Sequence, residues 1–283
     1  MPPTGGTGEA PLRRRYVGET IMKKLAICLT GLLLVGASIV LAQTFGVKKR
    51  MPKPHEFGNV VMKNYTEENK MAPVVFRHWF HRAKYTCRLC HVDLGFAMVV
   101  GETGVREDDV RNGIYCGACH DGTTAFAPEE MNARGEVKKE NCARCHSQGQ
   151  EVELEYDFYD FVKGFPKSRF GNRVDWMVAE EQGLIELSDY IEGVTIARRT
   201  LQNPKDATLE AKVAEMPDII FSHEKHAVWN GCELCHPEIF GVKTGGTVYE
   251  MQDIFDGRFC GACHGSVAFM NMDCQLCHTT DVY

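Results

Sequence analysis

The stretch Cys116-Gly-Ala-Cys-His120 and its copy Cys260-Gly-Ala-Cys-His264 belong to a Cys-x-x-Cys-His pattern that occurs six times in the 283 residues. The other copies are CRLCH at 87–91, CARCH at 142–146, CELCH at 232–236 and CQLCH at 274–278. Twelve of the 13 cysteines lie in these motifs: Cys87, Cys90, Cys116, Cys119, Cys142, Cys145, Cys232, Cys235, Cys260, Cys263, Cys274 and Cys277. Only Cys28 is left over, so no disulfide framework is expected.

This spacing predicts six covalently bound c-type haems. The two cysteines reach the two vinyl groups on one porphyrin edge and form thioethers, and the histidine that follows ligates the iron. Zinc ribbons, redox dithiols and disulfides also use paired cysteines, but none of them requires a histidine after every pair. The predicted proximal iron ligands are His91, His120, His146, His236, His264 and His278.

Five histidines lie outside the motifs, and four of them form a repeated Phe-x-His-x-x-His. An electron-transfer haem iron usually takes a second axial ligand, which is His or Met. Histidines three residues apart point toward two different haems from one short segment. We therefore predict four distal ligands, His78, His81, His223 and His226, and the fifth histidine is His55.

The chain is an internal duplication. PKPHEFGNVV (52–61) matches PKSRFGNRV (166–174), and PVVFRHWFH (73–81) matches PDIIFSHEKH (217–226). Each half continues with three motifs, the second being CGACH. The predicted domains are residues 1–42, an N-terminal lead with a signal peptide or anchor; 43–150, triheme module 1; 151–214, an inter-module segment; and 215–283, triheme module 2.

The motifs are too closely spaced for an ordinary hydrophobic core to form between them. We expect a multihaem cytochrome fold whose core is formed by the haems, with short helices at the motifs, short strands before each Phe-x-His, and much irregular chain. In the inter-module segment, the alternation at 151–158 predicts a half-buried strand. Residues 176–185 predict a helix, and 207–216 fit either a strand or a helix.

The order Phe-x-His-x-x-His, CxxCH, CGACH and CxxCH in each half resembles the cytochrome c7 type. These are triheme relatives of the tetraheme cytochromes c3 within the class III multihaem cytochromes. The resemblance implies that the first histidine of Phe-x-His-x-x-His ligates the iron of the first motif and the second that of the second motif. The implied pairs are His78 with His91, His81 with His120, His223 with His236, and His226 with His264.

The third haem of each half departs from this family pattern. Its distal ligand comes from just before the second motif in the family, as His or Met, and neither half has a histidine there. We assign Met251 to the haem of His278, the alternative being a gap-filling core methionine. The first half has Glu107 at that place. The haem of His146 has two candidate ligands, His55 and Met98, or no strong ligand.

The N-terminus predicts export. Lys23 and Lys24 precede an apolar run, Leu25 to Leu41, and small residues place signal-peptide cleavage before Gln43. An uncleaved membrane anchor is the alternative. Because haem attachment through thioethers takes place outside the cytoplasm, we expect the protein in the periplasm or at the cell surface.

Composition narrows the function. Residues 43–283 carry 36 acidic and 27 basic side chains, which argues against nucleic-acid binding. No catalytic constellation is evident. The sequence predicts an electron carrier, and not an enzyme, between a quinol-linked donor and a terminal reductase or outer-membrane conduit. The alternatives are a reductase with an open haem at His146, or the haem subunit of a membrane complex, homo-oligomer or filament.

Overall fold

The computed structural model describes residues 24–25, 27–28, 51–199, 202, 205–213 and 215–280. The chain divides into two compact units, Met1–Met51 and Pro52–Tyr283, and the second holds all six motifs. Of the predicted export segment, only four helical residues between 24 and 28 are described, and the cleavage position before Gln43 lies outside the described residues. Among the described residues, no helix combines the length and apolarity needed to cross a membrane.

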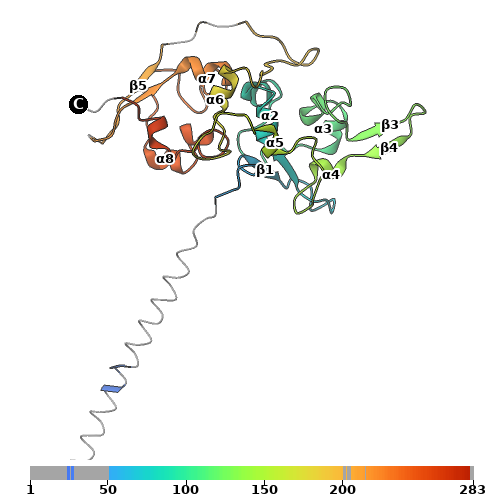
Figure 1. The fold of residues 1–283 in the computed structure, drawn as a ribbon, viewed down its shortest axis with the longest axis horizontal. Helices are drawn as coiled ribbons and strands as arrows, with labels where there is room; N and C mark the ends of the chain where they lie inside the picture. The colour runs from blue at the N-terminus through green and yellow to red at the C-terminus, as the bar shows by residue number, and fades with distance from the viewer. Residues whose placement is uncertain are drawn as a thin grey trace, which may run out of the picture. The chain divides into compact units, whose positions relative to one another are not determined.

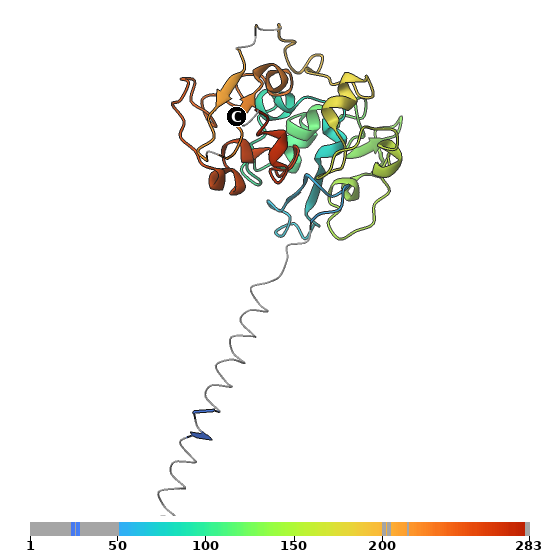
Figure 2. The ribbon, with the colours of Figure 1, turned by 60° about the vertical axis from the view of Figure 1, so that its left-hand side comes forward.

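Regular structure is sparse and short within the unit Pro52–Tyr283 (Figures 1 and 2). The described strands form two-stranded antiparallel sheets, in which β1 (Asn59–Met62) pairs with β2 (Val74–Arg77), β3 (Glu129–Met131) with β4 (Val137–Glu140), and β5 (Ala207–Leu209) with β6 (Ile219–Phe221). The strands predicted before each Phe-x-His are β2 and β6 and are confirmed.

Helices are equally short, and a helical turn occurs at or inside most motifs. The α-helices are α2 (His78–Arg82), α3 (Glu107–Arg111), α4 (Cys142–Cys145), α5 (Phe158–Phe161), α6 (Trp176–Glu181), α7 (His223–Asn230) and α8 (Met251–Phe255). Further helical turns at the motifs are the π-helical η1 (Leu89–Asp93) and the 3-10 turns η2 (Tyr115–Ala118), η3 (Phe259–Ala262) and η4 (Cys274–Leu276). The predicted short helices at the motifs and the large share of irregular chain are confirmed.

The duplication extends to details of packing. Helices α3 and α8, which precede the second motifs, begin with the same cap: the Arg106 amide donates to Asp109 (2.8 Å) and the Glu250 amide to Asp253 (2.8 Å). The glycine of each CGACH lies against the helix that precedes its own motif, which is α3 for Gly117 and α8 for Gly261. A Cβ on Gly117 would lie 2.0 Å from the Val110 carbonyl oxygen. Gly261 repeats this 2.0 Å approach in the second half. Only glycine fits at either position.

A core of side chains exists where the sequence analysis expected haems alone. Trp79 of α2 and Ala83, which caps the C-terminal end of this helix, pack with residues of the inter-module segment, namely Phe158, Val162, Val174, Trp176 and Ile185, all buried. Helix α2 therefore has two faces: His78 and His81 lie on one, and Trp79 anchors the other to the inter-module segment. The prediction of a core made only of haems was incomplete, because the aromatic residues of 158–176 are distant in sequence from the helix they cover.

Two expectations about the inter-module segment are corrected or refined. The strand predicted at 151–158 is wrong: residues 151–157 form no strand, and α5 begins at Phe158, capped by Asp157, which accepts from the Tyr159 amide (2.8 Å). The helix predicted at 176–185 is present as α6, and the ambiguous 207–216 contains strand β5. The boundaries at residues 150 and 214 stay predictions, and the hairpin β5–β6 spans the second of them.

The second copy of the Phe-Gly-Asn segment packs on the first copy. Buried Asn172 donates to the carbonyl oxygens of Pro54 (2.8 Å) and Phe57 (3.1 Å), and accepts from Trp176 Nε1 (3.3 Å). Sequence similarity matches residues 52–61, which overlap β1, with residues 166–174. In the structure the second-half strand equivalent to β1 is instead β5. Strand β1 pairs with β2 and β5 pairs with β6, and both β2 and β6 lead into a Phe-x-His.

Candidate haem sites

Each Cys-x-x-Cys-His closes into a helical turn. The histidine amide donates to the carbonyl oxygen of the first cysteine at 2.9 Å for His120, His146, His264 and His278 and at 3.0 Å for His236. A helical turn places residues i, i+3 and i+4 on one face. The two thiols and the imidazole of a motif therefore share one side, as attachment of one porphyrin edge and ligation of its iron require.

A hydrogen bond from Nδ1 orients the imidazole ring of each of the six motif histidines. The partner is a backbone carbonyl oxygen in every case, and because a carbonyl oxygen can only accept, Nδ1 carries the proton. The partners are Phe96 for His91 (2.9 Å), Phe126 for His120 (3.0 Å), Ala72 for His146 (2.6 Å), Phe240 for His236 (2.7 Å), Phe269 for His264 (3.2 Å) and Pro217 for His278 (2.5 Å). This arrangement leaves Nε2 free as a metal ligand and is typical of metal-binding histidines.

The four predicted distal histidines follow the same rule. Their Nδ1 atoms lie on the carbonyl oxygens of Gly58 for His78 (2.6 Å), Arg77 for His81 (3.0 Å), Lys205 for His223 (2.9 Å) and Ser222 for His226 (2.8 Å). A phenylalanine fixes both rings of each pair. Phe76 meets His78 edge-on at 4.7 Å and His81 at 4.3 Å, and Phe221 meets His223 at 4.9 Å and His226 at 4.3 Å.

In three of the four implied axial pairs, the two imidazole rings lie near each other at a separation that fits an iron atom between them. The ring centres lie 6.4 Å apart for His78 and His91, 6.4 Å for His81 and His120, and 6.2 Å for His226 and His264. Iron bound at about 2 Å to each of two facing imidazole nitrogens separates the ring centres by about 6 Å, because each centre lies about 1 Å behind its nitrogen. The residues therefore fit a haem iron between them. In the described chain, His223 has a ring contact with Phe221 and none with His236.

Burial keeps two of these imidazoles in the neutral form that can ligate iron. It lowers the pKa of His81 to about 4 and that of His264 to about 4, so both imidazoles are neutral near pH 7 and keep the Nε2 lone pair. Burial also raises the pKa of the Cys90 and Cys263 thiols to about 12. These cysteines therefore lie in apolar surroundings that suit a porphyrin edge.

The third motif of each half is the least complete. Met251 is the first residue of α8 and is 41% exposed. Met98 is half-buried in the loop after η1. His55 is the one histidine of the eleven whose Nδ1 bonds a side chain, the Tyr159 hydroxyl, at 3.0 Å. The roles of all three stay predictions.

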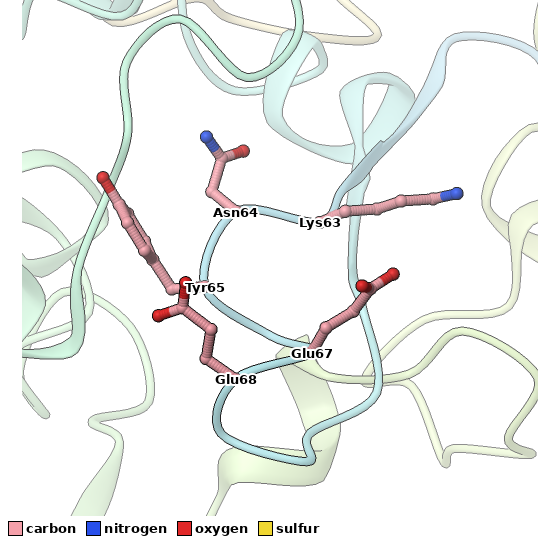
Figure 3. Close-up of a pocket in the computed structure, with 5 residues that line it drawn as sticks. All are labelled: Lys63, Asn64, Tyr65, Glu67 and Glu68. Atoms are coloured by element: carbon pink, nitrogen blue, oxygen red, sulfur yellow. The ribbon is translucent and has the colours of Figure 1, made fainter.

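Sequence reasoning missed the groups that orient the imidazoles, because they are backbone carbonyls and leave no side-chain signal. It also missed the contacts between the halves, which involve Arg82, Arg88 and Arg198. A surface hollow of about 390 Å³ is lined by Lys63, Asn64, Tyr65, Glu67 and Glu68 (Figure 3). Its lining holds no cysteine or histidine, so it is not a haem site.

Comparisons with known proteins identify the family of the chain. The family model for cytochrome c7 and related cytochrome c matches residues 74–147 and 219–279. Among solved structures, a c7-type three-heme cytochrome domain is 38% identical over 27% of this chain and 95% of its own (TM-score 0.25). The C-terminal hexaheme fragment of a dodecaheme cytochrome c is 24% identical over 79% of this chain and 98% of its own (TM-score 0.24). A search of curated proteins found no match. Because the family model matches twice, from the strand before Phe-x-His to the third motif, the chain belongs to the cytochrome c7 family and carries two of its modules in tandem.

Proposed function

We propose that the chain is an exported hexaheme electron carrier with one haem attached at each Cys-x-x-Cys-His. The observation that carries this proposal is the opposed histidine pairs, whose ring centres lie 6.2–6.4 Å apart with Nδ1 held by the backbone. When bound, haem supplies a one-electron iron couple whose potential depends on its axial ligands and surroundings.

The opposed pairs favour electron transfer over catalysis. A pair such as His81 and His120 would hold an iron from both sides and would leave no open position for a substrate. Both rings are fixed by carbonyl partners and by Phe76 or Phe126, so the ligands need little rearrangement when the iron changes oxidation state.

The partners follow from the chemistry and from export. We propose a membrane-linked, quinol-oxidising donor and a terminal acceptor, which is a reductase or an outer-membrane conduit. The excess of acidic residues in 43–283 favours basic or metallic partners and disfavours nucleic acid. Location in the periplasm or at the cell surface is proposed on the need to attach haem outside the cytoplasm. If residues 1–42 are retained, the carrier is anchored in the membrane.

Intact mass of the mature protein tests the haem number and the cleavage position together. The expected mass corresponds to six haems per chain. In a separate redox titration, we expect reversible reduction without turnover of a substrate. A colourless protein, or one that binds zinc at these thiols, would overturn the proposal.

A reductase is the second candidate because the sequence supplies no clear distal ligand for the haem of His146. His146 is oriented by Ala72, and Glu107 stands where the family pattern places the distal ligand of this haem. Carbon monoxide binding to the reduced protein separates the two functions. An electron carrier with closed haems gives no spectral change, whereas an open site at His146 gives a change equivalent to one haem.

A further inference from the structure

Arg88, the second residue of the first motif, is buried and bound to the inter-module segment. Its Nε donates to Asp189 Oδ1 (3.2 Å), and its Nη2 donates to the Asp189 carbonyl oxygen (3.3 Å) and ion-pairs with Oδ2. Thr86 donates to the same carboxylate (2.8 Å), and its amide donates to the Ser188 carbonyl oxygen (3.1 Å). Residues 86–88 are thus joined to 188–189.

The same arginine touches the second module. A Cβ on Gly231, which ends α7 just before the first motif of module 2, would lie 2.5 Å from Arg88 Cδ. The carbon chain of Arg88 therefore runs directly past Gly231. The space that glycine leaves here is filled by a residue from inside a motif of the other module.

Arg198 of the inter-module segment bridges the two modules by charge. Its Nη2 lies 2.6 Å from Asp93 Oδ1 in η1, and its Nη1 ion-pairs with Glu233, a residue inside the CELCH motif. The side chain of Asp93 is 9% exposed, so this carboxylate depends on the arginine for its charge partner. One guanidinium thus links the first motif regions of both modules.

A third arginine completes the contact. The guanidinium of Arg82 lies 5.2 Å from the ring centre of Trp176 in the inter-module segment and 5.2 Å from that of Trp229 in α7. This geometry fits a cation held between two aromatic faces. Trp229 Nε1 also donates to Glu180 of α6 (2.6 Å), which secures the ring in place.

We infer that Arg82, Arg88 and Arg198 form a fixed junction that holds the first motif of module 1 beside module 2, and that electrons cross between the modules at this point. The inference rests on the proposed function, since only haem-loaded motifs carry electrons. The arginines are positioning residues: they set the separation of the two motif regions without ligating iron.

The experiment uses the full haem-loaded protein and compares matched arginine substitutions. Arg88→Gln is paired with Arg144→Gln, which alters an arginine inside another motif that lies over Phe126 of the same module. Arg198→Gln is paired with Arg199→Gln, an exposed neighbour with no ion pair in the described chain. The readouts are deuterium exchange at the Thr86 and Ser188 amides, and the rate of electron equilibration between modules after photoreduction.

We expect Arg88→Gln and Arg198→Gln each to speed exchange at these amides by about tenfold or more and to slow equilibration between the modules, while both controls match the wild type. Unchanged exchange and equilibration in both junction variants, with six haems bound, would overturn the junction alone. If Arg88→Gln does not fold, Arg198→Gln decides the matter, because Arg198 is partly exposed. Absence of haems from the wild type would instead overturn the proposed function.

Discussion

The imidazole rings of His78 and His91 lie nearly parallel, at an interplanar angle of 10°, although one begins α2 and the other lies in η1. Each is fixed by a different carbonyl oxygen, that of Gly58 for His78 and that of Phe96 for His91. The polypeptide itself therefore sets the separation of the two Nε2 atoms, and the spacing suits an iron ligated from both sides.

Removing a distal histidine should open one haem and leave the others closed. We expect His78→Ala to create a carbon monoxide site equivalent to one haem per chain, because Nε2 of His78 is the proposed distal ligand of the iron held by His91. Absorbance spectra of the reduced protein with and without carbon monoxide measure it. His55→Ala is the control: its ring bonds Tyr159, and a new carbon monoxide site in this variant would show that His55 is a ligand.

The glycine in CGACH should be irreplaceable. We expect Gly117→Ala to lower the free energy of unfolding by about 2 kcal/mol or more, because a Cβ 2.0 Å from the Val110 carbonyl oxygen forces the backbone apart. Denaturant titration of the haem-loaded protein measures this change. Gly164→Ala is the matched control, since a Cβ there meets nothing within 4 Å. Equal stability of the two variants would contradict the prediction.

Met251 can be tested as the distal ligand of the haem of His278. Methionine ligation raises the potential of a haem relative to two histidines. If Met251 is the ligand, Met251→Leu removes the most oxidising midpoint of module 2. Spectroelectrochemical titration follows this change, with Met272→Leu, at a methionine that is 56% exposed, as the control. A titration curve identical to the wild type would show that Met251 is a surface methionine.

The junction should weaken in acid. Burial raises the pKa of Asp189, but hydrogen bonds from Arg88 and Thr86 outweigh it and bring the pKa below the ordinary value of 3.8. A carboxyl whose pKa is lowered by folding stabilises the folded form above its unfolded pKa, and this contribution is lost as the pH falls. We therefore expect protection of the Thr86 amide to fall as the pH drops through and below 3.8, the ordinary value for Asp189. Asp189→Asn should remove this acid dependence, and a persisting dependence would assign it to another group.

Local chemistry could be predicted from the chain alone because its signals are local. A helical turn brings the thiols and imidazole of one Cys-x-x-Cys-His together whatever the rest of the chain does. The strands before Phe76 and Phe221 were also correctly predicted. The alternation at 151–158 failed as a strand signal because no partner strand lies beside it.

Sequence by itself identified the c-type cytochrome chemistry and the tandem arrangement, and it predicts six attachment points, since these depend on residue type and short spacing. Only the tertiary structure decided which carbonyl oxygen orients each imidazole, that Trp79 and Trp176 share a core, and that Arg88 meets Gly231. Those contacts join residues far apart along the chain, and they form only when several weakly structured segments pack at once.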